Sequence, residues 1–150
     1  MKMWRAGEAS LIHATCSLPR YATRSVAGLR RSDHITNTLA SFHWLRVSER
    51  IQFKLATLIY RSLHGLAPQY LADDLCFGTD IPGRRRLRSA ISFQLVVPRT
   101  RLVTVGDRTF SAAGSRLWNS LPHDVTECQT LAAFRRKLKH FLFSLSFPGH

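Results

Sequence analysis

Apolar residues recur at helical spacing in two long stretches of this chain, and this periodicity constrains its fold more than any other feature. The first stretch, residues 48–63, carries Ile51, Leu55, Leu58, Ile59 and Leu63 at i, i+4, i+7, i+8 and i+12. The second, residues 130–145, carries Leu131, Phe134, Leu138, Phe141, Leu142 and Leu145. This spacing places each set on one face of an α-helix. Two long amphipathic helices with apolar core faces are therefore expected.

Capping residues and helix breakers predict where these helices begin and end. Ser48 and Thr130 stand at N-cap positions, where a hydroxyl can accept a hydrogen bond from a free backbone N–H. Gly65 fits the left-handed position that closes the first helix. Pro68 is suited to begin a separate short helix over residues 68–75, because the N–H that proline lacks would have no hydrogen-bond partner at the start of a helix.

Two further helices are predicted on either side of this part of the chain. Ser32 or Asp33 can cap a short helix that ends near Trp44 and Leu45. Another apolar stripe lies between residues 110 and 121 and is stopped by Pro122. Its members are Phe110, Ala113, Gly114, Leu117 and Leu121, with Trp118 beside them.

A two-stranded β-hairpin is predicted at residues 93–105. Phe93, Leu95 and Val97 alternate with Gln94 and Val96, residues 102–105 are rich in β-branched side chains, and Pro98-Arg99-Thr100 separates the two runs. The expected fold class is mainly α, with several short helices around this hairpin; a small α+β domain is the alternative. Residues 1–30 are expected to be a poorly ordered leader, and residues 31–148 a helical domain with a basic loop at about 77–92.

The charge balance points to an anionic partner. The 150 residues include 22 Lys and Arg against 9 Asp and Glu, a formal net charge of +13. Such an excess repels itself in a compact chain, so nucleic acid or an acidic surface is the natural partner. The candidate phosphate-binding residues are Arg84, Arg85, Arg86 and Arg88 in the loop, Arg99 and Arg101 beside the hairpin turn, and Arg135, Arg136, Lys137 and Lys139 on the last helix. The alternatives are a solvated basic face, or a composition that reflects a GC-rich coding sequence.

Several segments, in order, resemble the C-terminal region of non-LTR (LINE-type) retrotransposon reverse transcriptases. The segments are Val26–Ile35, Asp33–Leu75, Arg84–Ala90, Leu95–Pro122 and Thr130–Phe147. HGLAPQYL, followed by GDR-F and RLWNSLP, is the most specific combination. The resemblance covers about residues 26–148, whereas residues 1–25 depart from the family pattern.

The resemblance implies a piece of a larger enzyme that copies its own RNA into DNA at a nicked target. The endonuclease and polymerase domains of such a parent lie upstream of the segments matched here. The resemblance therefore implies a non-catalytic fragment. One hypothesis is a module that binds RNA or DNA backbone without reading sequence; the other is a structural remnant that once packed against the polymerase core and has no independent activity.

No residue pattern predicts a catalytic or metal site. Asp73 and Asp74 invite comparison with the aromatic-x-Asp-Asp of reverse transcriptases, but Tyr70 stands three residues before the pair rather than two. Two-metal phosphoryl transfer needs clustered carboxylates, and only Glu8, Asp33 and Glu49 lie upstream. Ser, His and Asp also lie close together at 120–124, and are interpreted as turn residues. His34, His43 and His64 lack a Cys or carboxylate at ligand spacing and are interpreted as structural.

The remaining features argue against a disulfide scaffold, a zinc site and a membrane span. The three cysteines, Cys16, Cys76 and Cys128, are odd in number and far apart, which argues against a disulfide scaffold or zinc site. No apolar stretch approaches the ~20 residues of a membrane span. We expect no cofactor and no small-molecule substrate. A nuclear or cytoplasmic protein is expected, although the basic first 30 residues, with Glu8 as their one acid, also suit a mitochondrial transit peptide or a fortuitous upstream start.

Overall fold

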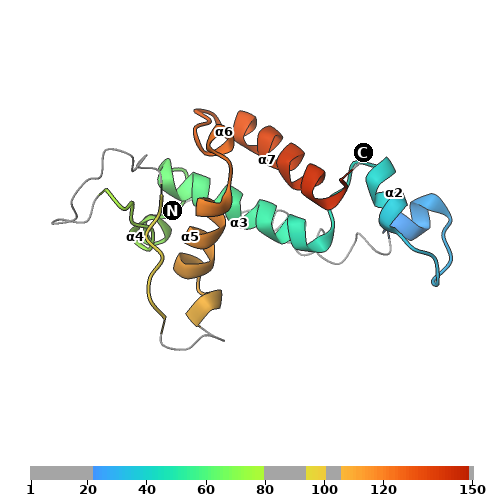
Figure 1. Ribbon diagram of the computed structural model, residues 1–150, viewed down its shortest axis with the longest axis horizontal. Coiled ribbons are helices and arrows are strands. Elements are labelled where there is room, and N and C mark those ends of the chain that lie inside the picture. Colours follow the sequence, from blue (N-terminus) through green and yellow to red (C-terminus); the bar gives the residue numbers. More distant parts are fainter. Residues whose placement is uncertain (1–21, 80–93, 101–105, 149–150) are drawn as a thin grey trace, which may run out of the picture. The chain divides into compact units, whose positions relative to one another are not determined.

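The computed structural model describes residues 22–79, 94–100 and 106–148, and this part of the chain is mainly helical, as predicted (Figure 1). The chain divides into two compact units. The first comprises residues 1–51 and 140–150, and the second comprises residues 52–139. Each unit is described by itself.

The first unit has a small apolar core around helix α2 (Thr36–Ser41). Leu39 and Ala40 of α2 are buried with Phe147. Ile35, Trp44 and Phe143 are partly buried against them. Residues 22–27, inside the predicted leader, also form a helix, whereas residues 1–21 lie outside the described residues.

The predicted limits of α2 were wrong at both ends. The helix begins after Ile35 without a side-chain cap, because the Asp33 carboxylate accepts a hydrogen bond from the Arg30 N–H (2.7 Å). It ends at Ser41, not near Trp44. The chain reverses at His43, whose φ of 51° is left-handed.

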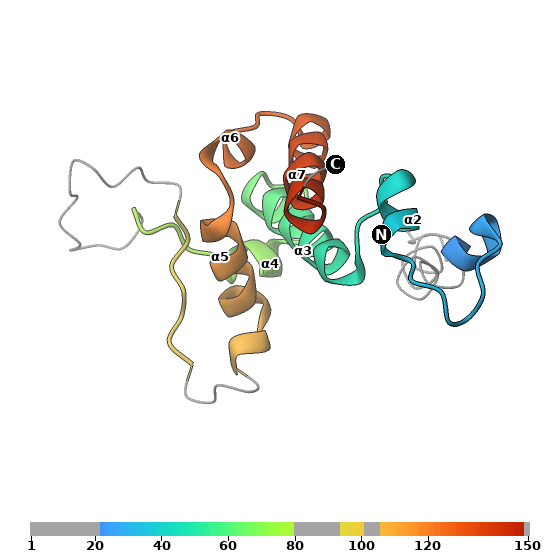
Figure 2. The ribbon, with the colours of Figure 1, turned by 45° about the vertical axis from the view of Figure 1, so that its right-hand side comes forward.

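The second unit packs parts of three helices around aromatic side chains. These are α3 (Val47–Leu63), α5 (Phe110–Ser120) and α7 (Leu131–Ser146). The Tyr60 ring of α3 stacks on Phe134 of α7 with centroids 4.4 Å apart, and Trp118 of α5 lies 6.0 Å from Phe134. Within this unit, α3 and α7 lie side by side in Figures 1 and 2. Three helices thus meet at one aromatic cluster.

The apolar stripes predicted the helices better than their buried faces. In α3 the most buried side chains are Ala56, Ile59 and Tyr60, at i, i+3 and i+4, whereas Ile51 of the predicted stripe is 54% exposed. In α7, Phe134, Leu138 and Leu142 are buried as expected. Leu145, predicted to belong to the same face, is 61% exposed. Both exceptions belong to the first unit.

Short elements connect the long helices of the second unit. They are α4 (Gln69–Asp73), the 3-10 helix η1 (Gly106–Arg108) and α6 (His123–Thr126). Gly65 has a φ of 67°, so its predicted role at the end of α3 is confirmed. The short helix predicted over residues 68–75 is present but shorter, because it begins at Gln69, after Pro68, and ends at Asp73. At η1 a close approach excludes any side chain at Gly106, since a Cβ there would lie 2.5 Å from the Thr100 Cβ.

One predicted N-cap is confirmed and one was wrong. The Ala133 N–H donates to the Thr130 Oγ1 (3.3 Å) at the start of α7. Helix α3 instead begins at Val47, before Ser48. The Ser48 hydroxyl donates a hydrogen bond to the Glu49 carboxylate (2.8 Å) instead of capping the helix.

The predicted β-hairpin is not supported. Leu95 forms an isolated antiparallel bridge with Phe77, and no strand is present in residues 94–100 or elsewhere in the described chain. On the side away from Phe77, both backbone groups of Leu95 are bonded to the Asn119 side chain. The Leu95 N–H donates to the Asn119 Oδ1, and the Asn119 Nδ2 donates to the Leu95 carbonyl, both at 2.8 Å. Neither backbone group of Leu95 is therefore left for a second strand. Residues 101–105, the expected second strand, lie outside the described residues.

Candidate nucleic-acid interface

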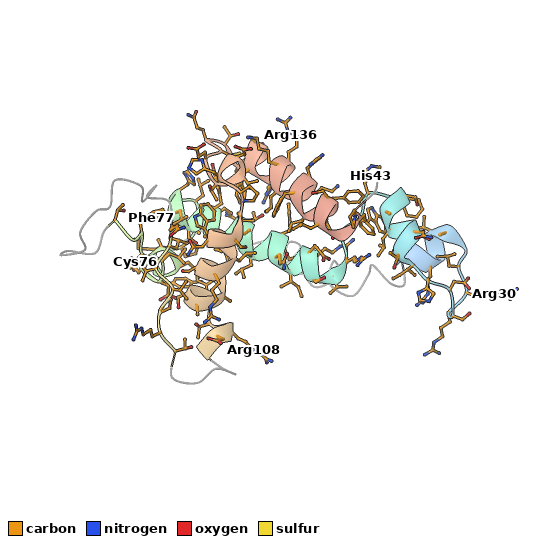
Figure 3. All side chains as sticks on the ribbon, in the orientation of Figure 1. Arg30, His43, Cys76, Phe77, Arg108 and Arg136 are labelled. Atoms are coloured by element: carbon orange, nitrogen blue, oxygen red, sulfur yellow. The ribbon has the colours of Figure 1, made fainter. Side chains whose placement is uncertain are left out.

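Helix α7 presents three of the predicted cations together. Arg135, Arg136 and Lys139 are all exposed, and Lys139 follows the two arginines by four and three residues, a spacing that makes side chains neighbours on a helix surface. Phe134 and Leu138, buried in the aromatic core, hold the opposite side of the helix. Arg136 projects outward from α7 in Figure 3. We call Arg135, Arg136 and Lys139 the α7 cationic face.

Lys137, the fourth predicted cation of α7, has a different environment. Its Nζ donates a hydrogen bond to the backbone carbonyl of Asp124 (2.9 Å), just inside α6. Because a full turn of helix is 3.6 residues, Lys137 lies off the line that joins Arg135, Arg136 and Lys139. It serves the fold of its own unit and is not included in the cationic face.

Among the described residues, no acidic side chain forms an ion pair with the α7 cationic face. Helix α7 contains no Asp or Glu. Among the residues that the structure describes, the ion pairs are Arg116–Asp107 (2.7 Å) and His123–Glu127 (2.9 Å), and neither involves this face. Like charges three or four residues apart destabilise a helix by roughly 0.2–0.5 kcal/mol per pair. An anion bound across the face would relieve this repulsion.

Arg116, another arginine of the second unit, is paired with Asp107. The Asp107 Oδ1 accepts hydrogen bonds from the Arg116 Nη2 (2.7 Å) and the Thr100 Oγ1 (2.8 Å). The hydrogen bond from Arg116 and then that from Thr100 hold the pKa of the Asp107 carboxyl below its usual value. The same pairing raises the pKa of Arg116. Arg116 is thereby committed to the fold.

The remaining predicted phosphate-binding residues fall into two groups. Arg99 is exposed in the segment 94–100. Arg84, Arg85, Arg86, Arg88 and Arg101 lie outside the described residues. The structure therefore brings together three of the ten candidates.

The residues examined for catalysis are engaged in local structure. Asp73 and Asp74 are exposed, and the Asp73 carboxylate accepts a hydrogen bond from the Gln69 Nε2 (3.0 Å). The Ser120 hydroxyl donates to the Leu117 carbonyl (2.7 Å), and His123 pairs with Glu127. In the described ranges no group of three His, Cys, Asp or Glu side chains could hold a metal ion. In the same ranges no helix has the length and apolar character of a membrane span.

A second group of residues, in the first unit, was missed by the sequence analysis. The Phe42 ring lies 5.6 Å from that of Trp44, and the His43 ring stacks on Phe143 at 5.2 Å and 12°. Arg46 lies over the Phe147 ring (4.9 Å) and Arg50 over Trp44 (5.9 Å). We call Phe42, His43, Trp44, Arg46 and Arg50 the aromatic–arginine cluster.

The sequence carried a signal for this cluster. Three ring-bearing residues, Phe42-His43-Trp44, come in succession, and two arginines follow within six residues of Trp44. Sequence reasoning placed Trp44 near a helix end and interpreted His43 as a structural histidine. Phe42 and His43 are exposed in the structure, whereas Trp44 is partly buried.

No protein-family model, curated protein or solved structure matches this chain.

Proposed function

We propose that this chain is a non-catalytic piece derived from the C-terminal region of a LINE-type reverse transcriptase, and that it binds the phosphate backbone of RNA or DNA without reading sequence. The proposed origin rests on the ordered motifs between residues 26 and 148. The proposed activity rests on the α7 cationic face. It does not depend on a reaction centre.

The roles of the motif residues support a non-catalytic piece. Gly65 closes α3, Asp107 of the GDR motif pairs with Arg116 of RLWNSLP, and Asn119 holds Leu95. Trp118 of the same motif is buried in the aromatic core. These side chains are used to build the fold, so their presence as a set does not require chemistry at a substrate.

The observation that carries the binding proposal is the exposure of Arg135, Arg136 and Lys139 on a helix without acids. Guanidinium groups donate paired hydrogen bonds to phosphate oxygens. Cations that replace condensed counterions on a nucleic acid give affinity that falls with salt. The formal net charge of +13 adds long-range attraction.

The test is a filter-binding titration of the 150-residue chain with duplex DNA at several salt concentrations. If about six phosphates are neutralised, log K against log salt has a slope near −5. Duplexes of unrelated sequence should bind equally. Absence of salt-dependent binding would remove the proposal.

A triple variant, Arg135→Gln, Arg136→Gln and Lys139→Gln, locates the contact. Glutamine has a helix propensity close to those of Arg and Lys, so α7 should be retained and, at low salt, slightly stabilised by the loss of repulsion. The matched control is Arg30→Gln, Arg31→Gln and Lys137→Gln, which lowers the net charge equally. Arg30 and Arg31 are exposed in the first unit.

A structural remnant without activity is the second candidate, and exposed apolar side chains favour it. Ile51, Leu145 and Tyr70 are 54%, 61% and 67% exposed. Apolar surface that once packed on a larger protein would bind a hydrophobic dye and promote aggregation. A sharp cooperative melt of the isolated chain with dispersed amide resonances would count against this candidate, whereas dye binding without a cooperative melt would favour it.

A further inference from the structure

We propose that the aromatic–arginine cluster is a stacking platform for unpaired bases, so that the chain prefers single-stranded nucleic acid to duplex. This inference rests on the proposed function, because it names the class of nucleic acid that is bound. It adds a surface in the first unit that the α7 cationic face does not include.

The first observation is that two exposed rings, those of Phe42 and His43, pack on inner aromatic rings. Phe42 is 39% exposed, and its ring leans on Trp44 at 48°. His43 is exposed, and its ring is nearly parallel to Phe143. Trp44 and Phe143 themselves pack on the buried core of Leu39, Ala40 and Phe147. The outer rings are therefore supported by fixed inner rings.

The second step is the backbone at His43. The His43 N–H donates to the Ala40 carbonyl (3.0 Å) and the Trp44 N–H to the Leu39 carbonyl (2.9 Å), which is the Schellman arrangement that ends a helix. Its left-handed position, here φ 51°, favours glycine because a Cβ is strained there. Non-glycine residues held in this conformation cluster at functional sites. The turn thus places an exposed imidazole directly after Phe42.

The third step is the placement of positive charge among the rings. The Arg46 guanidinium lies 4.9 Å from the centroid of Phe147, and Arg46 is exposed. The Arg50 Nε donates to the Leu45 carbonyl (3.0 Å), which fixes this side chain beside Trp44. Aromatic rings interleaved with arginines match single strands, because successive bases stack on rings while cations follow the backbone. In a duplex the faces of the bases are already stacked on one another.

The test compares a single-stranded 12-nucleotide oligo-dT with a duplex of the same length, using the 150-residue chain. The variant Phe42→Leu with His43→Asn removes both outer rings; asparagine tolerates the left-handed backbone. Loss of base stacking should weaken single-strand binding about tenfold or more, with little change for duplex. The salt slope should stay unchanged, because no cation is removed.

A single variant, His43→Gly, tests whether reduced binding could result from unfolding instead of the loss of a ring. Glycine relieves the backbone strain, so the midpoint of thermal unfolding should stay the same or rise. Single-strand binding should nevertheless fall. A variant that is at least as stable but binds less cannot be explained by unfolding.

The outcomes separate this inference from the proposed function. Wild-type binding that is salt-dependent but unaffected by Phe42→Leu with His43→Asn overturns the platform and leaves backbone binding intact. Equal losses for single strand and duplex also overturn it. A wild-type chain that binds neither ligand removes both proposals.

Discussion

At the scale of single residues, Tyr60 connects α3 to two other parts of the second unit. It is 1% exposed, its ring stacks on Phe134, and its hydroxyl donates to the Cys128 carbonyl (2.7 Å). The hydrogen bond joins α3 to the loop before α7, 68 residues further along the chain. The hydroxyl thus fixes a contact that apolar packing alone would leave unspecified.

Replacing Tyr60 by Phe should therefore keep the ring stack and remove the hydrogen bond. We expect a loss of about 1 kcal/mol in the free energy of unfolding, the usual net value of such a bond. Tyr60→Ala should cost about 3–5 kcal/mol, because it also leaves a cavity. Urea unfolding measures both changes. Equal losses for the two variants would contradict the role given to the ring.

Tyr60 should also make stability depend on alkaline pH. Burial, with a smaller contribution from Cys128, raises the pKa of the Tyr60 hydroxyl above its ordinary value. The folded chain then retains a proton that the unfolded chain loses above about pH 10, so stability falls as pH rises from the unfolded pKa towards the folded one. Urea unfolding between pH 9 and pH 11 should show a smaller decline for Tyr60→Phe than for the wild type.

Asp107 gives a second prediction at this scale. The hydrogen bond from Arg116 is the main cause that lowers its pKa, so Arg116→Gln should raise that pKa towards the ordinary value. An NMR titration of the carboxyl carbon measures the shift directly. The stability that this pairing gives is present above the ordinary carboxyl pKa and is lost as pH falls through the lowered one. An unchanged pKa in the variant would show that Thr100 alone is responsible.

At the scale of elements, the link between Asn119 and Leu95 replaces a strand. Leu95 is buried, and its N–H and carbonyl are both bonded to the Asn119 side chain. On the other edge, Gly78 N–H to Gln94 carbonyl (2.9 Å) and Val96 N–H to Cys76 carbonyl (2.8 Å) complete the bridge. One amide thereby connects helix α5 to an extended segment.

Removing the Asn119 side-chain amide should detach the segment around Leu95 from helix α5. Asn119→Ala leaves two backbone groups of a buried residue without their partner, at a cost of about 2 kcal/mol or more. The Leu95 amide should also exchange its hydrogen faster. Ser120→Ala is the matched control, since the Ser120 hydroxyl bonds only to Leu117 of its own helix among the contacts described. Equal effects for the two variants would contradict the account of Leu95.

The same contact explains what the sequence could and could not predict. Local features could be predicted: the apolar spacing indicated the long helices, Thr130 a helix cap, Gly65 a helix end and Pro68 a helix start, because each depends on residues within about one helical turn. The pairing of Leu95 was not, because its partner lies 24 residues away. At the candidate site, spacing put Arg135, Arg136 and Lys139 on one helix. The hydrogen bond from Lys137 to the Asp124 carbonyl and the stacking of His43 on Phe143 depend on tertiary structure, and spacing could not predict them.

At the scale of the whole molecule, charge and fold give separate arguments about function. The excess of Lys and Arg over Asp and Glu explains attraction to a polyanion in general. The helical framework determines which cations act together, and it brings Arg135, Arg136 and Lys139 onto one exposed face of α7. If general charge alone governed binding, the position of a removed cation would not matter.

The difference in salt slope between the two triple variants tests this central claim most directly. With Arg135, Arg136 and Lys139 replaced by Gln, the slope of log K against log salt on duplex DNA should be shallower than that of the wild type by about 2.7, the loss of three phosphate contacts. The control with Arg30, Arg31 and Lys137 replaced, of equal net charge, should keep a slope close to the wild-type value. Two variants with the same slope would contradict the claim that the α7 cationic face holds the phosphates.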